Sequence, residues 1–295
     1  MELFIQVVVS GLLLGGVYAL LSVGLTLIFG VVRIINFAHG ELMMMAMYLT
    51  YWLFHVHHID PYLSILIVAP ALFLVGMGVQ RFIIQPIFDS SALMKIFVTV
   101  GLFIALQNLA LMLFKADFRT IQTSYSMATL DVAAISISVP RLVAFGFALG
   151  LLSGLYLLLK LTLVGKAMRA VAENRVVAQL MGIRVQRLYL ITFGMGSALT
   201  GIAGALLLPF TYVFPTVGGI YTLLAFVVVV LGGLGNMAGA FLGGLFIGLV
   251  ESFSGFYVSP ALKEAVYFVI FILILLVRPQ GLFGVGKGTE EVGLK

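Results

Sequence analysis

Long apolar segments recur along almost the whole chain, and they restrict its fold more than any other feature. They fall at about 4–29, 40–55, 62–84, 93–114, 140–161, 187–208, 219–234, 237–256 and 262–277. A bilayer-spanning helix needs about 20 predominantly apolar residues. The runs are too long for the strands of a membrane barrel and lack their two-residue alternation. Because a helix satisfies its own backbone hydrogen bonds in lipid, we predict an all-α polytopic integral membrane protein.

The composition supports this class, because too few charged residues are present to cover a water-exposed surface. The chain of 295 residues is 62% hydrophobic and 9% charged, whereas a soluble domain carries about 25% charged residues. We predict eight to nine transmembrane helices in one domain, 1–295. The doubtful span is 219–234, because it runs into the glycine-dense LGGLGNMAG at 231–239. Such sequence favours a short or broken helix, which is tolerated at membrane depth only inside protein or beside a cavity.

Several classes of function are disfavoured by what the chain lacks. The net charge of +5 comes without a long basic run, so we expect no nucleic acid partner. Cysteine is absent, which excludes disulfides and thiolate metal ligands. Three of the four histidines lie in the isolated loop HVHHID at 55–60, which is weak evidence for a metal. We therefore predict no metal site and no catalytic residues.

Basic residues indicate the side of the membrane that each loop occupies, because cytoplasmic loops carry an excess of Lys and Arg. The opening MELFIQVVVSGLLLGGVYALL has no basic region before its apolar run, so we interpret it as a retained first span. Placing 160–187 inside puts twelve basic residues inside and four outside. The N-terminus is then outside, and the C-terminal tail at 279–295 is cytoplasmic. The loop at 115–140 is then external, where it could cover the external mouth, contact a partner or be a plain connector.

A charged segment, LVGKAMRAVAENRVVAQLMGIRV at 163–185, interrupts the apolar chain past its midpoint. Within it, Gly165 comes directly before Lys166 and Gly182 directly after Met181. Because glycine is favoured just past a helix end, we predict a helix over about 166–181. Arg169 and Glu173 are four residues apart and are expected to pair, for about 0.2–0.5 kcal/mol. The helix could transmit force from a soluble partner or lie on anionic lipid. The residues alone leave both interpretations open.

Three blocks of the sequence resemble, in the same order, a known family of membrane proteins. NFAHGELMMMAMY at 36–48 follows YALLSVGLTLIFGVVRII, VGKAMRAVAENRVVAQLMGIRVQRLYLITFGMGSALTGIAGAL covers 164–206, and VVVVLGGLGNMAGAFLGGLFIGLVES covers 227–252. They are similar to the membrane-spanning permease subunits of bacterial branched-chain amino acid ABC importers of the Liv type, in particular to the LivH-type paralogue. The resemblance covers most of the chain. It is less specific for substrate, since urea and short-chain amide importers share these blocks.

The resemblance implies an ABC importer permease fold in which 163–187 is a cytoplasmic coupling segment. The implied partners are two ABC ATPase subunits, a second permease (a paralogue more readily than a copy) and a periplasmic substrate-binding protein, at a bacterial inner membrane. ATP and Mg²⁺ would be bound by the ATPases, so this chain needs no cofactor and has no ATPase activity of its own. GLFGVGKG at 281–288 has Gly288 where a phosphate loop needs Ser or Thr. The residues expected to couple to the ATPase are Lys166, Arg169, Glu173, Asn174, Gly182 and Arg184.

Polar residues in or beside the spans are candidates for a gate or pathway, because ionisable groups near the membrane interior are costly. We expect Asn36 to cap a helix start. His39 and Glu41 are expected at the cytoplasmic end of the first span, as an internal gate, an ATPase contact or plain loop packing. Gln107 and Asn108 lie mid-span, where they either bond a neighbouring helix or line the path. The last pathway candidates lie at the expected helix break, where backbone groups could meet substrate: Gly232, Gly233, Gly235 and Asn236.

Two further patterns concern contacts between spans. Gly11 and Gly15 are four residues apart, as are Gly244 and Gly248, and small residues at this spacing let helix backbones approach closely. Glu251, near the outer end of its span, could pair with Lys263 or reach the membrane interface.

The leading hypothesis for function is the translocation-pathway subunit of an ATP-driven importer for branched-chain or related hydrophobic amino acids, working by alternating access. An ABC permease for urea or short-chain amides is the alternative. An ion-coupled secondary transporter is disfavoured, because the spans hold few ionisable residues for a relay. A membrane-embedded enzyme would need a cluster of catalytic side chains that the sequence does not show. Besides the proteins named above, we expect membrane lipid as a partner.

Overall fold

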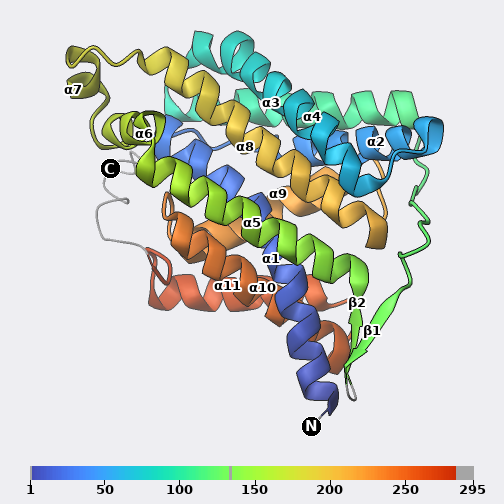
Figure 1. Ribbon diagram of the computed structural model, residues 1–295. Helices are drawn as coiled ribbons and strands as arrows, with labels where there is room; N and C mark the ends of the chain where they lie inside the picture. The colour runs from blue at the N-terminus through green and yellow to red at the C-terminus, as the bar shows by residue number, and fades with distance from the viewer. Residues whose placement is uncertain (1, 133–134, 284–295) are drawn as a thin grey trace.

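Helices form at all nine apolar segments in the computed structural model, which describes residues 2–132 and 135–283 (Figure 1). Six of them are long and apolar enough to cross a membrane, judged by length and composition. The other three, α2, α9 and α11, contain 19, 16 and 15 residues. The doubtful span is therefore a short helix, as predicted. The nine are α1 (Glu2–Val32), α2 (His39–His57), α3 (Pro61–Val79), α4 (Ala92–Phe114), α5 (Val139–Leu161), α8 (Val185–Leu207), α9 (Val217–Gly232), α10 (Met237–Tyr257) and α11 (Lys263–Val277).

Shorter elements extend or connect these helices. α3 continues into a π-helix, η1 (Gln80–Ile84), and a 3-10 turn, η2 (Gln85–Ile87), and the 3-10 turn η3 (Leu208–Phe210) follows α8. An antiparallel hairpin, β1 (Thr129–Val132) and β2 (Ile135–Ser138), precedes α5. It lies at one end of the bundle, beside the start of α1. Two short helices, α6 (Leu163–Glu173) and α7 (Arg175–Leu180), lie at the opposite end (Figure 1). We call these the hairpin end and the α6–α7 end.

α1 is the central helix of the bundle. In its most apolar window 83% of the residues are buried, against 11% for α4 and 17% for α5. Glycines let α10 approach it closely, because a Cβ built on Gly15 would lie 2.7 Å from Leu245 Cα, and one built on Gly244 would lie 2.5 Å from Ala19 Cα. The glycine spacing therefore serves helix packing, as predicted.

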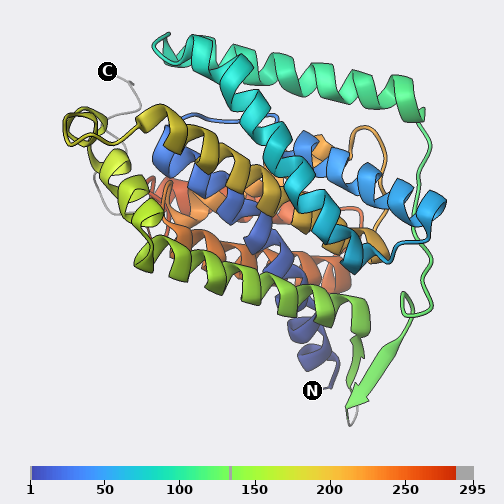
Figure 2. The same ribbon diagram turned by 45° about the horizontal axis from the view of Figure 1, so that its top comes forward.

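α4 is set off from the rest of the bundle, as Figure 2 shows. Its contacts with the core include the Thr99 hydroxyl, which donates to the Ile35 carbonyl at 3.1 Å, and the Phe103 ring, which lies beside Gly219 at the start of α9. α4 is therefore the long helix with the least packing to hold it in place.

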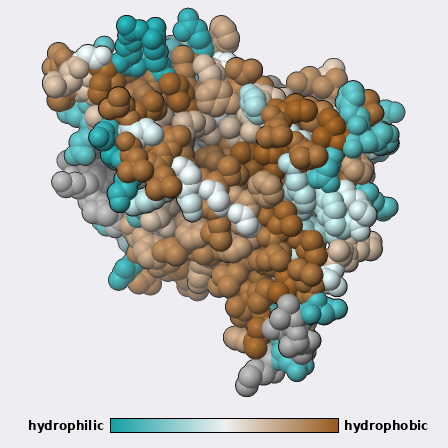
Figure 3. Space-filling view, in the orientation of Figure 1, coloured by the Kyte–Doolittle hydropathy of each residue, from teal (hydrophilic) through white to brown (hydrophobic). Residues whose placement is uncertain are grey.

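Apolar side chains cover much of the outer surface of the bundle, as Figure 3 shows for one face. Leu66 is 76% exposed, Phe82 76% and Met112 83%. Such side chains are stable on the outside of a protein only when lipid or another apolar surface covers them. The chain is accordingly a multi-pass membrane protein.

Residues 33–38 return into the bundle after α1 ends, and this differs from the expected position of NFAHGE. The chain there has no regular helix or strand, and α2 begins at His39. The His39 ring bonds the Leu21 carbonyl. Leu21 lies eleven residues before the end of α1, about 17 Å away at 1.5 Å per residue, roughly half of a 30 Å hydrocarbon core. His39 and Glu41 therefore lie deep inside the bundle, not at the cytoplasmic end of the first span.

Candidate functional site

The charged segment forms two helices, not the single helix expected over 166–181. α6 (Leu163–Glu173) begins after Thr162, whose side chain accepts from the Gly165 amide at 3.1 Å. Asn174 then has φ −150° and ψ 107°, and its side-chain oxygen accepts from the Val176 amide at 3.0 Å and from the Val177 amide at 3.1 Å. This N-cap starts α7 (Arg175–Leu180). Asparagine is a strong N-cap residue, so Asn174 could have predicted this break. Sequence analysis named Asn174 only as a residue that couples to the ATPase.

α6 is fastened to α1 and α5. Gly165 lies against Leu159 of α5, and the Arg169 guanidinium donates to the Leu159 carbonyl. The Arg33 guanidinium, just past the end of α1, donates to the Ala172 carbonyl at 2.8 Å. Among the described ion pairs Arg169 has none with Glu173, so the expected pair is replaced by a bond to the backbone of α5.

α7 is fastened to a different part of the bundle, the turn between α3 and α4. The Arg175 guanidinium lies 3.3 Å from the Asp89 carboxylate and 4.5 Å from the centroid of the Phe88 ring. Phe88 stacks on Tyr189 of α8 at 4.9 Å between ring centroids. Sequence analysis did not assign Arg175, because nothing local in the sequence indicates a contact with residues 86 positions away.

The outer face of α7 is apolar and exposed. Val176, Leu180 and Met181 are 64%, 81% and 78% exposed. Gly182 has φ +83°, and the Ile183 amide bonds the Ala178 carbonyl, which is the Schellman ending expected of a glycine just past a helix. The charged coupling candidates are also exposed: Lys166 and Glu173 lie on α6, and Arg184 follows α7.

A cluster of buried polar residues occupies the start of α2. Asn36, His39 and Glu41 are each 0% exposed. The His39 Nε2 donates to the Leu21 carbonyl at 3.1 Å and lies 2.8 Å from the Thr200 hydroxyl. The Asn36 side-chain oxygen accepts from the Ala38 amide at 3.1 Å, but Ala38 is itself the N-cap residue of α2 and no side chain caps this helix. Asn36 therefore stabilises the turn before α2, and the expectation that it caps the helix was wrong.

The start of α2 is also bonded to α9. The Gly40 amide donates to the Thr222 hydroxyl at 2.9 Å, and that hydroxyl donates to the Phe37 carbonyl at 3.2 Å. A Cβ built on Gly218 would lie 2.5 Å from the carboxyl carbon of Glu41. Thr200 and Thr222 were missed by sequence analysis, because a single threonine in a helix more often bonds its own backbone.

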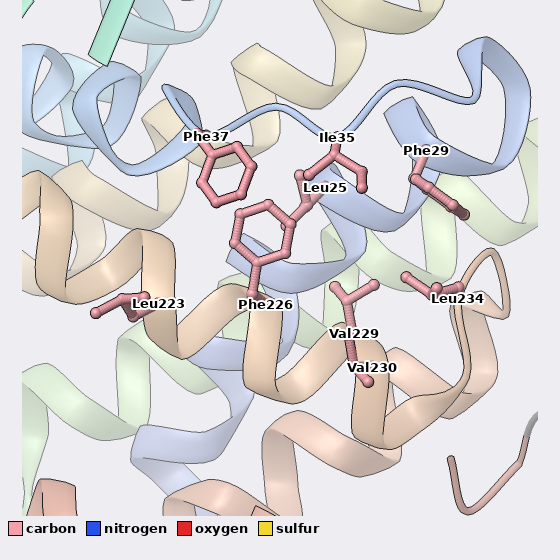
Figure 4. Close-up of a pocket in the computed structure, with 9 residues that line it drawn as sticks. All are labelled: Leu25, Phe29, Ile35, Phe37, Leu223, Phe226, Val229, Val230 and Leu234. Carbon is pink, nitrogen blue, oxygen red and sulfur yellow. The ribbon is translucent and has the colours of Figure 1, made fainter. Parts of the chain in front are cut away.

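An apolar cavity of ≈ 250 Å³ adjoins this segment, because Ile35 and Phe37 line it. Figure 4 shows the lining side chains, which come from α1, the 33–38 segment, α9 and the residues just after α9. Phe37 and Phe226 face one another with ring centroids 5.0 Å apart. The lining residues are Leu25, Phe29, Ile35, Phe37, Leu223, Phe226, Val229, Val230 and Leu234.

Comparison with known proteins identifies the class of this bundle. Residues 7–275 match the family described as "Branched-chain amino acid transport system / permease component". The chain belongs to this family. The permease is 30% identical to the high-affinity branched-chain amino acid transport system permease proteins LivH of Salmonella typhimurium and BraD of Pseudomonas aeruginosa, over 95% of its length and 96% of theirs. It is 31% identical to a probable LivH of Methanocaldococcus jannaschii, over 90% of its length and 88% of that protein. No solved structure matches it.

Among the described residues, the other pathway candidates of the permease have no hydrogen bond to the buried cluster. Gln107 and Asn108 are on loosely packed α4, where the Asn108 amide bonds the Ile104 carbonyl of its own helix at 2.8 Å. Gly233 and Gly235 have φ of +92° and +82° and end α9 near Gly30, at the cavity's far side. Asn236 caps α10 through the Gly239 amide and donates to the Phe283 carbonyl. Gly232 packs against Gly239. The tail beyond residue 283, with most of GLFGVGKG, lies outside the described residues.

Proposed function

We propose that the permease is the translocation-pathway subunit of an ATP-driven importer for branched-chain or related hydrophobic amino acids, working by alternating access. Membership of the family supports transport, and its relatives LivH and BraD are named as branched-chain amino acid permeases, which supports this substrate class. The apolar cavity beside the buried cluster supports a hydrophobic side chain over urea or short-chain amides, because its lining offers apolar side chains alone. We propose that all of 1–295 acts as one permease domain.

The observation that carries this proposal is the exposed apolar face of α7. Exposed apolar residues at the end of a membrane protein mark a contact with a partner. Val176, Leu180 and Met181 would fill a groove on an ABC ATPase, and the charged residues of the coupling segment would surround that contact. Two ATPases would bind and hydrolyse ATP with Mg²⁺, and this chain would contribute no ATPase activity and hold no cofactor.

The two anchors of the coupling segment suggest how force would pass into the membrane. α6 is bonded to the ends of α1 and α5, which belong to the tightly packed bundle. α7 is bonded to the turn that leads into α4, the loosely held helix whose inner surface touches Ile35 and Gly219. Moving α7 relative to α6 at Asn174 would therefore shift α4 against the segment that carries the buried cluster.

The remaining partners follow from this arrangement. The α6–α7 end would face the cytoplasm of a bacterial inner membrane, with the N-terminus outside, in accord with the excess of basic residues assigned to that side. A periplasmic binding protein would deliver the amino acid at the hairpin end. A second permease, most simply a paralogue, would complete the path.

Reconstitution of the permease with its ATPases, the second permease and the binding protein in proteoliposomes tests this function. Leucine uptake should require ATP. Glu173→Ala and Arg169→Ala should lower it at least tenfold while the permease still folds. Asp117→Ala, an exposed acidic residue in the external loop, should leave uptake unchanged. Uptake by the permease alone, driven by an ion gradient, would show that the importer proposal is wrong.

A further inference from the structure

The Glu41 carboxylate has no partner in the part of the chain that the structure describes. Both of its oxygens are buried without a hydrogen bond, and the residue is 0% exposed. A buried carboxylate without a hydrogen-bond partner is costly in any low-dielectric interior, and ionisable residues inside a membrane bundle are usually tied to transport. No other carboxylate in the described residues is buried and unpaired.

Two other polar atoms of the segment 36–41 are also buried without a hydrogen-bond partner. The His39 ring lies against α1 and α8, whereas the Glu41 carboxylate lies against α9. His39 Nε2 donates to a carbonyl and so carries the ring proton, which leaves Nδ1 as an acceptor, and Nδ1 is buried without a partner. Asn36 Nδ2, a donor, is also buried without a partner. The segment 36–41 therefore offers a carboxylate and an imidazole nitrogen as acceptors and an amide as a donor.

We propose that Glu41 receives the α-ammonium group of the amino acid in transit. An ammonium group has three N–H donors and a positive charge, so it supplies the hydrogen bonds and the counter-charge that the Glu41 carboxylate lacks. This deepens the proposed function and rests on it.

The apolar cavity is a separate, neighbouring station for the side chain. Gly218, which touches Glu41, is five residues from Leu223 and eight from Phe226 on α9, and both of these line the cavity; the separations along the helix are about 7.5 Å and about 12 Å at 1.5 Å per residue. A leucine bound at Glu41 would therefore reach at most the near edge of the cavity. The amino acid would therefore bind Glu41 first and move toward the α6–α7 end, into the cavity, as the bundle opens inward.

The start of α9 and the side of α4 cover Glu41 in this conformation. Gly218 lies directly against the carboxylate, and Phe103 of α4 lies beside Gly219. Because α4 is loosely packed, its displacement gives the simplest access to Glu41 from the hairpin end.

Coupled transport in the reconstituted importer tests the inference, with leucine-loaded binding protein as the probe and ATP hydrolysed per leucine as the readout. In Glu41→Gln, which keeps the shape and removes the charge, uptake should fall at least tenfold while ATP hydrolysis stays within twofold of wild type. The ratio of ATP to leucine should therefore rise about tenfold. Glu41→Asp should restore part of the uptake. Glu251→Gln makes the same change at a buried carboxylate that has partners. In the fraction of this variant that assembles into a folded complex, the ratio of ATP to leucine should be unchanged.

Two results would overturn the inference. Wild-type uptake in Glu41→Gln would show that no ammonium group binds there. A parallel loss of uptake, ATP hydrolysis and thermal stability, with the ratio unchanged, would show that Glu41 only maintains the fold. If the wild-type complex shows no ATP-driven leucine uptake, the proposed function itself is wrong and the inference falls with it.

Discussion

Two buried carboxylates in the same bundle have opposite surroundings. Glu251 of α10 is 6% exposed and accepts from the Tyr18 hydroxyl at 2.7 Å and from the Lys263 ammonium at 2.6 Å. Glu41 of α2 is 0% exposed, and neither of its oxygens has a partner in the described residues. The chain itself satisfies the first carboxylate, which ties α10 to α1 and α11. The second is left for something that enters the bundle, which is why we connect it with transport and not with stability.

Glu251→Ala is expected to have the largest effect on stability. Removing one partner of a buried ion pair costs about 3–5 kcal/mol, and because the Lys263 side chain is 40% exposed, we expect about 3 kcal/mol. Unfolding of the purified permease in detergent measures it. Glu41→Ala is the matched control and should cost less than about 1 kcal/mol, because no hydrogen bond is lost. Equal losses in the two variants would abolish the contrast between the sites.

Two buried tyrosines test the same contrast between a polar group with a partner and one without, and the expected change in stability is smaller. Tyr18→Phe removes a hydrogen bond to a charged group, worth about 1.5–3 kcal/mol. Tyr48→Phe removes a hydroxyl that is buried without a partner in the described residues, while its ring stays stacked on Phe114. We therefore expect Tyr18→Phe to lower the unfolding midpoint in detergent and Tyr48→Phe to leave it unchanged or to raise it. A comparable drop in both would mean that ring packing, not the bond to Glu251, stabilises this region.

The sequence predicted which segments become helices, but it did not predict the long-range contacts that set how deep the segments between them lie in the bundle. Apolar length located all nine helices, and the glycine spacing of α1 and α10 predicted their close contact, because both signals are local. The depth of His39 was missed, because residues 33–38 look like an ordinary loop and only contacts with Leu21 and Thr200 show that they re-enter the bundle.

The candidate site could also be predicted only in part, because sequence patterns do not show long-range contacts. Asn36, His39 and Glu41 were singled out because polar residues are rare in this chain, but the absence of a partner for Glu41 is a property of the packed bundle. The pairing of Glu251 with Lys263 was one of two open possibilities, and the structure shows the pair. Roles in gating and coupling stay predictions.

An exposed ion pair completes the comparison, because its contribution to stability is expected to be the smallest. Arg175 and Asp89 are 3.3 Å apart, with side chains 43% and 87% exposed, and such pairs contribute about 0.2–1 kcal/mol. In a double-mutant cycle of Arg175→Ala and Asp89→Ala, the coupling energy for unfolding should fall in that range. If the pair links α7 to the turn before α4, each single change should lower ATP-driven uptake severalfold and the double change should lower it no further. Asp117→Ala serves as the exposed control. Independent, multiplying losses of uptake would show that the two residues act separately, and force would then have to reach α4 by another contact.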